Sequence, residues 1–178
     1  MTRDPFKSFL RNYYLAGFFY DFIFAYSVYT ALINIRGKSV FEISLLLSWW
    51  SLVALAMEIP SGALADRWSR KWMLTLAPLI KALCFLTWFW AGDNFYLFAL
   101  GFLFWGTGSS FVSGTTEALL YDTLKYYKRT DDYEKILGRK KLYYYVAIAT
   151  GGFLGGAIAQ YDVNNAILLS ILPLMLSS

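Results

Sequence analysis

Four ionisable side chains, Asp21, Glu58, Lys81 and Glu117, lie inside long apolar stretches of this sequence. Charged groups are costly in hydrocarbon, and those found there mark ion pairs, proton relays or ligand sites. At ~1.5 Å of rise per helical residue, each lies about 12 to 15 Å from the same end of the predicted helices. We therefore predict a polar layer inside a helical bundle. This layer either only pairs helices or contains a carboxylate that contacts solute or carries a proton.

The composition gives little support for a metal site or for an enzyme active site. The chain has no histidine and a single cysteine, Cys84, inside an apolar stretch. Neither a zinc site nor a histidine-activated nucleophile is expected. The glycines between Gly151 and Gly156 lie in an apolar stretch with no Lys-Ser/Thr after them, which excludes a phosphate-binding loop. We expect no enzyme, no cofactor and no metal.

The elements that must position the four charges are membrane helices. The chain has 178 residues, of which 58% are hydrophobic and 16% charged. A helix needs about 20 apolar residues to span a bilayer, and backbone groups in lipid must be satisfied within the segment. The prediction is an all-α membrane protein, a polytopic helical bundle. Its helices are expected at about 12–34, 40–65, 72–91, 95–121 and 142–161, with a shorter apolar segment at 166–176.

The basic residues predict the orientation of the bundle. Thirteen of them fall on one side, at the N-terminus, after the second stretch and in the connection 123–141, whereas only Arg36 and Lys38 fall on the other. The positive-inside rule then predicts a multi-pass protein of the cell membrane with its N-terminus and residues 123–141 in the cytoplasm. The net charge of +4 thus reflects topology, and no nucleic-acid partner is expected. Interfacial belts are expected from Trp68 and Trp72 at one surface and from Trp88 and Trp90 at the other.

The loop after the second stretch resembles a known signature. Its spacing is similar to that of the loop between helices 2 and 3 of the major facilitator superfamily, with Ser69 where the family usually has glycine. The matching residues are Gly62, Asp66, Arg67, Arg70 and Lys71.

The resemblance implies a fold and roles for particular residues. The fold is the N-terminal six-helix half of a facilitator-superfamily transporter, with helix 6 incomplete. Asp66, Arg70 and Asp122 would form a charge cluster that braces the inner gate. Helices 1 and 4 would line the central cavity, which favours Asp21 and Glu117 over Lys81 as residues that meet solute or proton.

Two further patterns concern helix packing. Small and polar residues in the fourth stretch share one helical face, which is either a cavity lining or a packing seam. These residues are Gly106, Ser110, Ser113, Glu117 and Tyr121. The paired glycines at 151–152 and 155–156 indicate close contact between the fifth stretch and a neighbouring helix.

Together these features predict a secondary active transporter that moves a small solute by alternating access. Proton coupling is a hypothesis for which Glu117 is the preferred residue. The chain is interpreted as a fragment, with the lipid bilayer, an unknown small-molecule substrate and a missing C-terminal half as partners. The other interpretation is a non-transporting membrane scaffold or assembly subunit, whose charges only pair helices.

Overall fold

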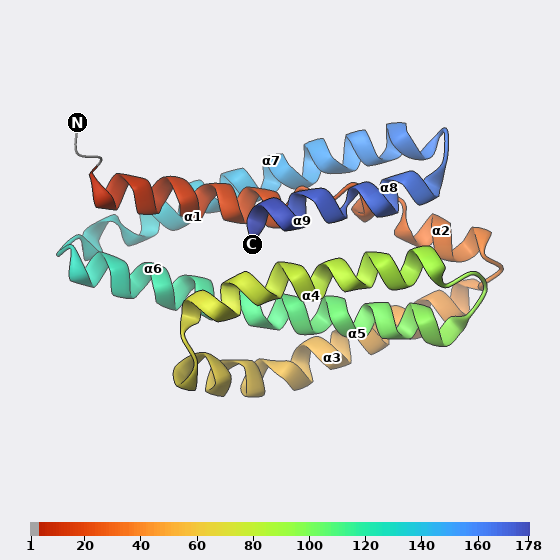
Figure 1. Cartoon of the computed structure of the whole chain (residues 1–178), viewed down its shortest axis with the longest axis horizontal. Helices are drawn as coiled ribbons and strands as arrows, with labels where there is room; N and C mark the ends of the chain where they lie inside the picture. The colour runs from red at the N-terminus through yellow and green to blue at the C-terminus, as the bar shows by residue number, and fades with distance from the viewer. Residues whose placement is uncertain (1–3) are drawn as a thin grey trace.

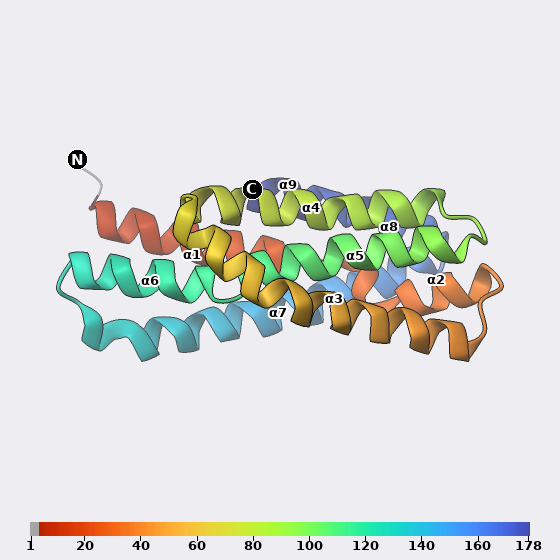
Figure 2. The same cartoon turned by 90° about the horizontal axis from the view of Figure 1, so that it is seen from below.

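A computed structural model describes residues 4–178, apart from the side chain of Asp66. The described chain is helical, and its helices run along one long axis (Figures 1 and 2). The start of α1 and the end of α6 lie at one end of this axis, and α2 lies at the other (Figure 1). The elements are α1 (Pro5–Asp21), η1 (Phe24–Ser27), α2 (Tyr29–Ile35), α3 (Val40–Arg67), α4 (Arg70–Trp90), α5 (Phe95–Val112), α6 (Thr115–Tyr126), η2 (Thr130–Asp132), α7 (Tyr133–Ala159), α8 (Val163–Leu169) and α9 (Ile171–Ser177).

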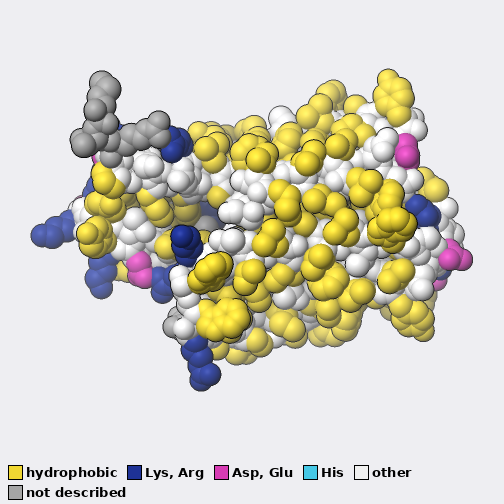
Figure 3. Space-filling model, viewed as in Figure 1, with side chains coloured by type: hydrophobic (Ala, Val, Ile, Leu, Met, Phe, Trp, Pro, Cys, Tyr) yellow, Lys and Arg dark blue, Asp and Glu magenta, His cyan; other side chains and the backbone are white. Residues whose placement is uncertain are grey.

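Within residues 4–178, five helical segments are long and apolar enough to cross a membrane, and α8 and α9 form a shorter apolar segment. Hydrophobic side chains cover the middle of the visible face, whereas Lys and Arg side chains gather at the end where α1 begins (Figure 3). The predicted all-α, polytopic bundle is therefore confirmed. The five segments are Pro5–Ile35, Val40–Ala65, Arg70–Trp90, Phe95–Tyr126 and Thr130–Ala159.

The first and fourth spans are interrupted helices, whereas continuous helices were expected at 12–34 and 95–121. In the first span, α1 ends at Asp21 and the chain passes through Phe22 and Ile23 before η1 begins. In the fourth span, Ser113 and Gly114 separate α5 from α6, and Gly114 has φ +29°, outside the helical region. Such breaks are tolerated at membrane depth only where neighbouring groups satisfy the freed backbone.

The connection expected at 123–141 is mostly helical. The α6 helix continues to Tyr126, and α7 begins at Tyr133. Most charges of this segment lie on helices, whereas Lys128 and Arg129 lie in the turn between α6 and η2. The first, polar turns of α7 therefore lie beside α6 at the same end of the long axis (Figure 1).

The break in the first span packs against glycines of α7 and donates a hydrogen bond to Ser170, between α8 and α9. A Cβ atom on Gly155 would lie 1.9 Å from the Phe24 carbonyl oxygen, and one on Gly151 would lie 3.0 Å from the Ile23 nitrogen. The Ala25 backbone N–H, which the break leaves without a helical partner, donates to the Ser170 hydroxyl at 2.9 Å. The contact that the glycine pattern predicted is thus a contact with the backbone of a broken helix.

Aromatic side chains form the core between α4 and α5. Trp88 is fully buried, and its indole N–H donates to the Phe98 carbonyl at 3.2 Å. Gly101 leaves room for this indole, since a Cβ there would lie 2.2 Å from the ring nitrogen. The expected place of Trp88 in an outer belt is therefore wrong, because its ring turns inward onto α5. The indoles of Trp68, Trp72 and Trp90 are exposed.

Candidate functional site

A cavity of about 580 Å³ lies where both interrupted spans meet α7 and α9. Asp21, from the end of α1, and Glu117, from the first turn of α6, both line it. Its walls also carry apolar side chains, including Phe9, Leu74, Val112 and Leu119. A cavity of this size and composition is typical of sites for small organic molecules.

Asp21 is linked to Lys81 through a tyrosine. The Tyr26 hydroxyl donates to Asp21 Oδ1 at 3.4 Å, and Lys81 Nζ donates to the Tyr26 oxygen at 2.7 Å. Lys81 also donates to the Tyr20 carbonyl at 3.2 Å, and it lies 3.8 Å from the centroid of the Tyr20 ring. That carbonyl lies near the C-terminal end of α1, where a cation is favourable. Lys81 is 1% exposed, so it supports the cavity from behind.

Glu117 faces the cavity without such support. Its carboxylate forms no hydrogen bond and no ion pair with any residue in the described part of the chain, 4–178. Its place in the first turn of α6 suits a negative charge. Two buried hydroxyls of the same cavity, those of Tyr13 and Tyr20, also have no hydrogen-bond partner in the described part of the chain. Such groups are unusual, because buried polar groups are normally paired.

Lys140 lines the cavity from α7, although the sequence placed it in the cytoplasmic connection. Its Nζ lies 5.3 Å from the centroid of the Tyr13 ring. A helical pattern could have revealed it, because Leu137, Lys140 and Tyr144 recur at steps of three and four and all line the cavity.

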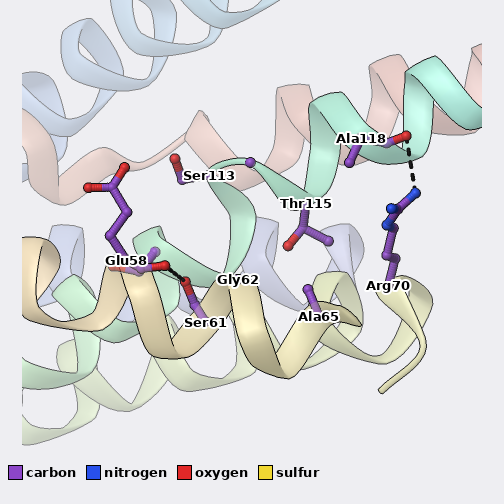
Figure 4. A pocket seen from close by; sticks show the side chains of 10 residues that line it. Glu58, Ser61, Gly62, Ala65, Arg70, Ser113, Thr115 and Ala118 are labelled. Atoms are coloured by element: carbon purple, nitrogen blue, oxygen red, sulfur yellow. Dashed lines mark hydrogen bonds between the residues drawn. The ribbon is translucent and has the colours of Figure 1, made fainter. Parts of the chain in front are cut away.

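Glu58 lies apart from this cavity. It lines a smaller pocket of about 180 Å³ between α3 and the break in the fourth span. Figure 4 shows its carboxylate on α3, with the Ser61 hydroxyl donating to the Glu58 carbonyl. Of the four charges expected in one layer, the structure brings Asp21 and Glu117 into one cavity. It places Lys81 behind that cavity, next to Tyr26, and Glu58 in another pocket.

The small-residue face of the fourth span divides at the helix break. On α5, the Ser110 hydroxyl donates to the Ala54 carbonyl of α3 at 3.0 Å, and a Cβ on Gly106 would lie 2.9 Å from Val53. Ser113, in the break, and Glu117, on α6, line the cavity, whereas Tyr121 does not. The α5 part of the face is therefore a packing seam, and the part from Ser113 to Glu117 is a cavity lining.

The signature loop joins α3 to α4 through Trp68 and Ser69. Arg70 forms an ion pair with Asp122. Its guanidinium also donates to the Ala118 carbonyl at 3.3 Å (Figure 4). Ser69 has φ −65° and ψ 129°, a conformation open to any residue, so serine fits in place of the usual glycine. Gly62 lines the small pocket, and Arg67 and Lys71 are exposed. The Asp66 side chain, like Arg3, lies outside the described part of the structure.

Comparison with known proteins identifies the family. The family model described as Major Facilitator Superfamily matches residues 13–178. A search of curated proteins finds no match. The family model covers nearly the whole chain, and the helical, membrane-competent structure agrees with it. The chain therefore belongs to the major facilitator superfamily and is a multi-pass membrane protein of this family of transporters.

Proposed function

We propose that this chain forms the solute pathway of a secondary active transporter that works by alternating access. The observation that carries the proposal is the cavity in which Asp21 and Glu117, from two interrupted spans, face the same space. Interrupted helices are typical of transporter sites, because they expose polar groups at membrane depth. Within this proposal, Glu117 is the coupling residue, and Asp21 is held by Tyr26 and Lys81.

The proposal includes a second half of the transporter. Folds of this kind place their site between two repeats, which rock against each other during the cycle. The second half, in the same or another polypeptide, would then close the cavity opposite α1, α6 and α7. Arg70 and Asp122 would brace the inner gate against it.

The proposed location is the cell membrane, with the N-terminus in the cytoplasm. The support is the excess of basic residues at one end of the bundle. In intact cells, a cysteine in place of Lys38 is expected to react with an impermeant thiol reagent, whereas one in place of Lys128 is expected to react only after permeabilisation. Labelling of the Lys128 position from outside would contradict this topology.

Disruption of the proposed gate is expected to lower transport. Arg70→Ala and Asp122→Asn should each reduce solute uptake by about fivefold or more, because a loss of about 1 kcal/mol from one of two states changes their ratio by that factor. The double variant should be no worse than the stronger single variant, because the two residues act as one network.

Uptake normalised to folded protein in the membrane measures this effect. Arg129→Ala is the matched control, because Arg129 forms an exposed ion pair with Asp132 within one turn and such pairs contribute little. Strictly additive effects would show that Arg70 and Asp122 act separately.

A further inference from the structure

An open groove of about 550 Å³ lies on the surface where α3 ends and α4 begins. Its lining residues are Trp68, Ser69, Trp72 and Leu76. Trp72 and Leu76 are four residues apart and therefore lie on one face of α4. Trp68 and Trp72 are 55% and 61% exposed, so the described chain leaves most of these aromatic walls uncovered.

The groove crosses the boundary between lipid head groups and hydrocarbon. The second membrane-competent segment ends at Ala65 and the third begins at Arg70, so Trp68 and Ser69 lie just beyond both. Leu76 lies about 9 Å farther along α4, by the rise of an α-helix, and belongs to the third segment. Indole rings favour this boundary, because they combine an apolar body with a polar N–H group.

Positive charge flanks the groove. Arg67 and Lys71 directly precede the two tryptophans in the sequence, and both bases are exposed. The third base of the loop, Arg70, is paired with Asp122. Asp66, the only acid of the loop sequence, can balance just one of the other two bases. At least one positive charge therefore remains beside the indoles at the membrane surface.

An anionic phospholipid matches both the apolar and the charged part of this groove. Its acyl chain would cover the indoles, and its head group would supply the negative charge that basic residues attract at a membrane surface. A free phosphate ion would leave the indoles uncovered. A zwitterionic phospholipid would bring no net charge to the bases.

We propose that this groove is a binding site for an anionic phospholipid, whose head group lies beside Arg67 and Lys71 and whose acyl chain lies along Trp72 and Leu76. The inference goes beyond the proposed function, because it concerns the lipid-facing surface rather than the solute cavity. It also differs from an aromatic belt, because a belt of indoles does not select the charge of a head group.

Quenching of tryptophan fluorescence by brominated lipids tests the proposal, because bromine on an acyl chain quenches only nearby indoles. The purified full chain is placed in phosphatidylcholine nanodiscs that contain increasing amounts of brominated phosphatidylglycerol or brominated phosphatidylcholine. The quenching of Trp72 is the difference between the chain and its Trp72→Phe variant, and Trp68→Phe serves in the same way. We expect phosphatidylglycerol to be preferred at these indoles by about fivefold or more, the contribution of one base near a membrane surface.

Removal of the two bases should remove the preference. The double variant Arg67→Gln/Lys71→Gln is expected to lower it to the value found at Trp90, an exposed indole at the other end of α4. Lys71→Arg retains the charge and should retain the preference. Lys135→Gln is the matched control, since Lys135 is an exposed lysine on α7 and its loss should leave the preference unchanged.

The inference is overturned if the preference at Trp68 and Trp72 equals that at Trp90, because the groove then receives lipid like any other part of the surface. It is also overturned if the preference survives the loss of both bases. Absence of quenching by either lipid would overturn it too, because the groove would then not be in contact with lipid.

Discussion

Replacement of Glu117 by glutamine is expected to abolish proton-driven accumulation of solute while exchange of solute across the membrane continues. Glutamine keeps the size and polarity of the side chain but cannot take up and release a proton. Exchange requires no net proton movement, so it should survive. The expectation follows from the position of Glu117 in the cavity without a hydrogen-bond partner in the described structure.

The measurement uses the transporter in proteoliposomes, with accumulation followed under an imposed proton gradient and exchange followed without one. Glu134→Gln is the control, because Glu134 is an exposed carboxylate in the first turn of α7. Normal accumulation by Glu117→Gln under the gradient would exclude Glu117 as the coupling residue. It would favour a role for the cavity charges in holding helices together.

Gly155→Ala is expected to cause a large loss of stability. The new methyl group would lie 1.9 Å from the Phe24 carbonyl oxygen, which belongs to backbone rather than to a flexible side chain. That backbone is fixed nearby, because the Ala25 N–H donates to Ser170 and the Ser27 hydroxyl donates to the Gly152 carbonyl at 2.9 Å. Relieving such an overlap costs about 1–3 kcal/mol, or more where the neighbour cannot move.

The adjacent Gly156 provides a matched control on the same helix. A Cβ there would meet no atom within 4 Å, so Gly156→Ala should be neutral or should stabilise α7 by roughly 0.5–1 kcal/mol. Thermal unfolding of both variants in detergent compares them directly. Equal midpoints for Gly155→Ala and Gly156→Ala would show that the first span does not pack on α7 as described.

The fold class could be predicted from the sequence because long apolar segments have few alternatives in a bilayer. The helix breaks could not, because neither break contains a proline. Only Gly114 gives a local signal, and the break at Phe22 and Ile23 depends on groups far away in the chain. Lys81, Ser170 and the α7 glycines satisfy or accommodate the interrupted backbone.

Residue counting predicts a depth for each charged residue but not the direction of its side chain. A similar depth for Asp21, Glu58, Lys81 and Glu117 stays a prediction, and it does not say which way each side chain points. Packing directs Glu58 to another pocket and Lys81 behind Tyr20 and Tyr26.

Two other side chains were misplaced for related reasons. Lys140 was missed because a run of charges resembles a solvated loop, whereas α7 begins early enough to bring one of its lysines into the cavity. Trp88 was assigned to an interface because tryptophan is common there. Its burial depends on the space that Gly101 leaves on α5.

Access to the cavity from both sides of the membrane tests the central claim most directly. Ser113 lines the cavity at the break in the fourth span, and the native Cys84 is buried. A cysteine in place of Ser113 is labelled with an impermeant thiol reagent in right-side-out and in inside-out membrane vesicles from cells that express the transporter. Alternating access predicts labelling in both preparations. If the cysteine were labelled in only one of the two preparations, whichever direction of proton gradient is imposed, alternating access through this cavity would be contradicted.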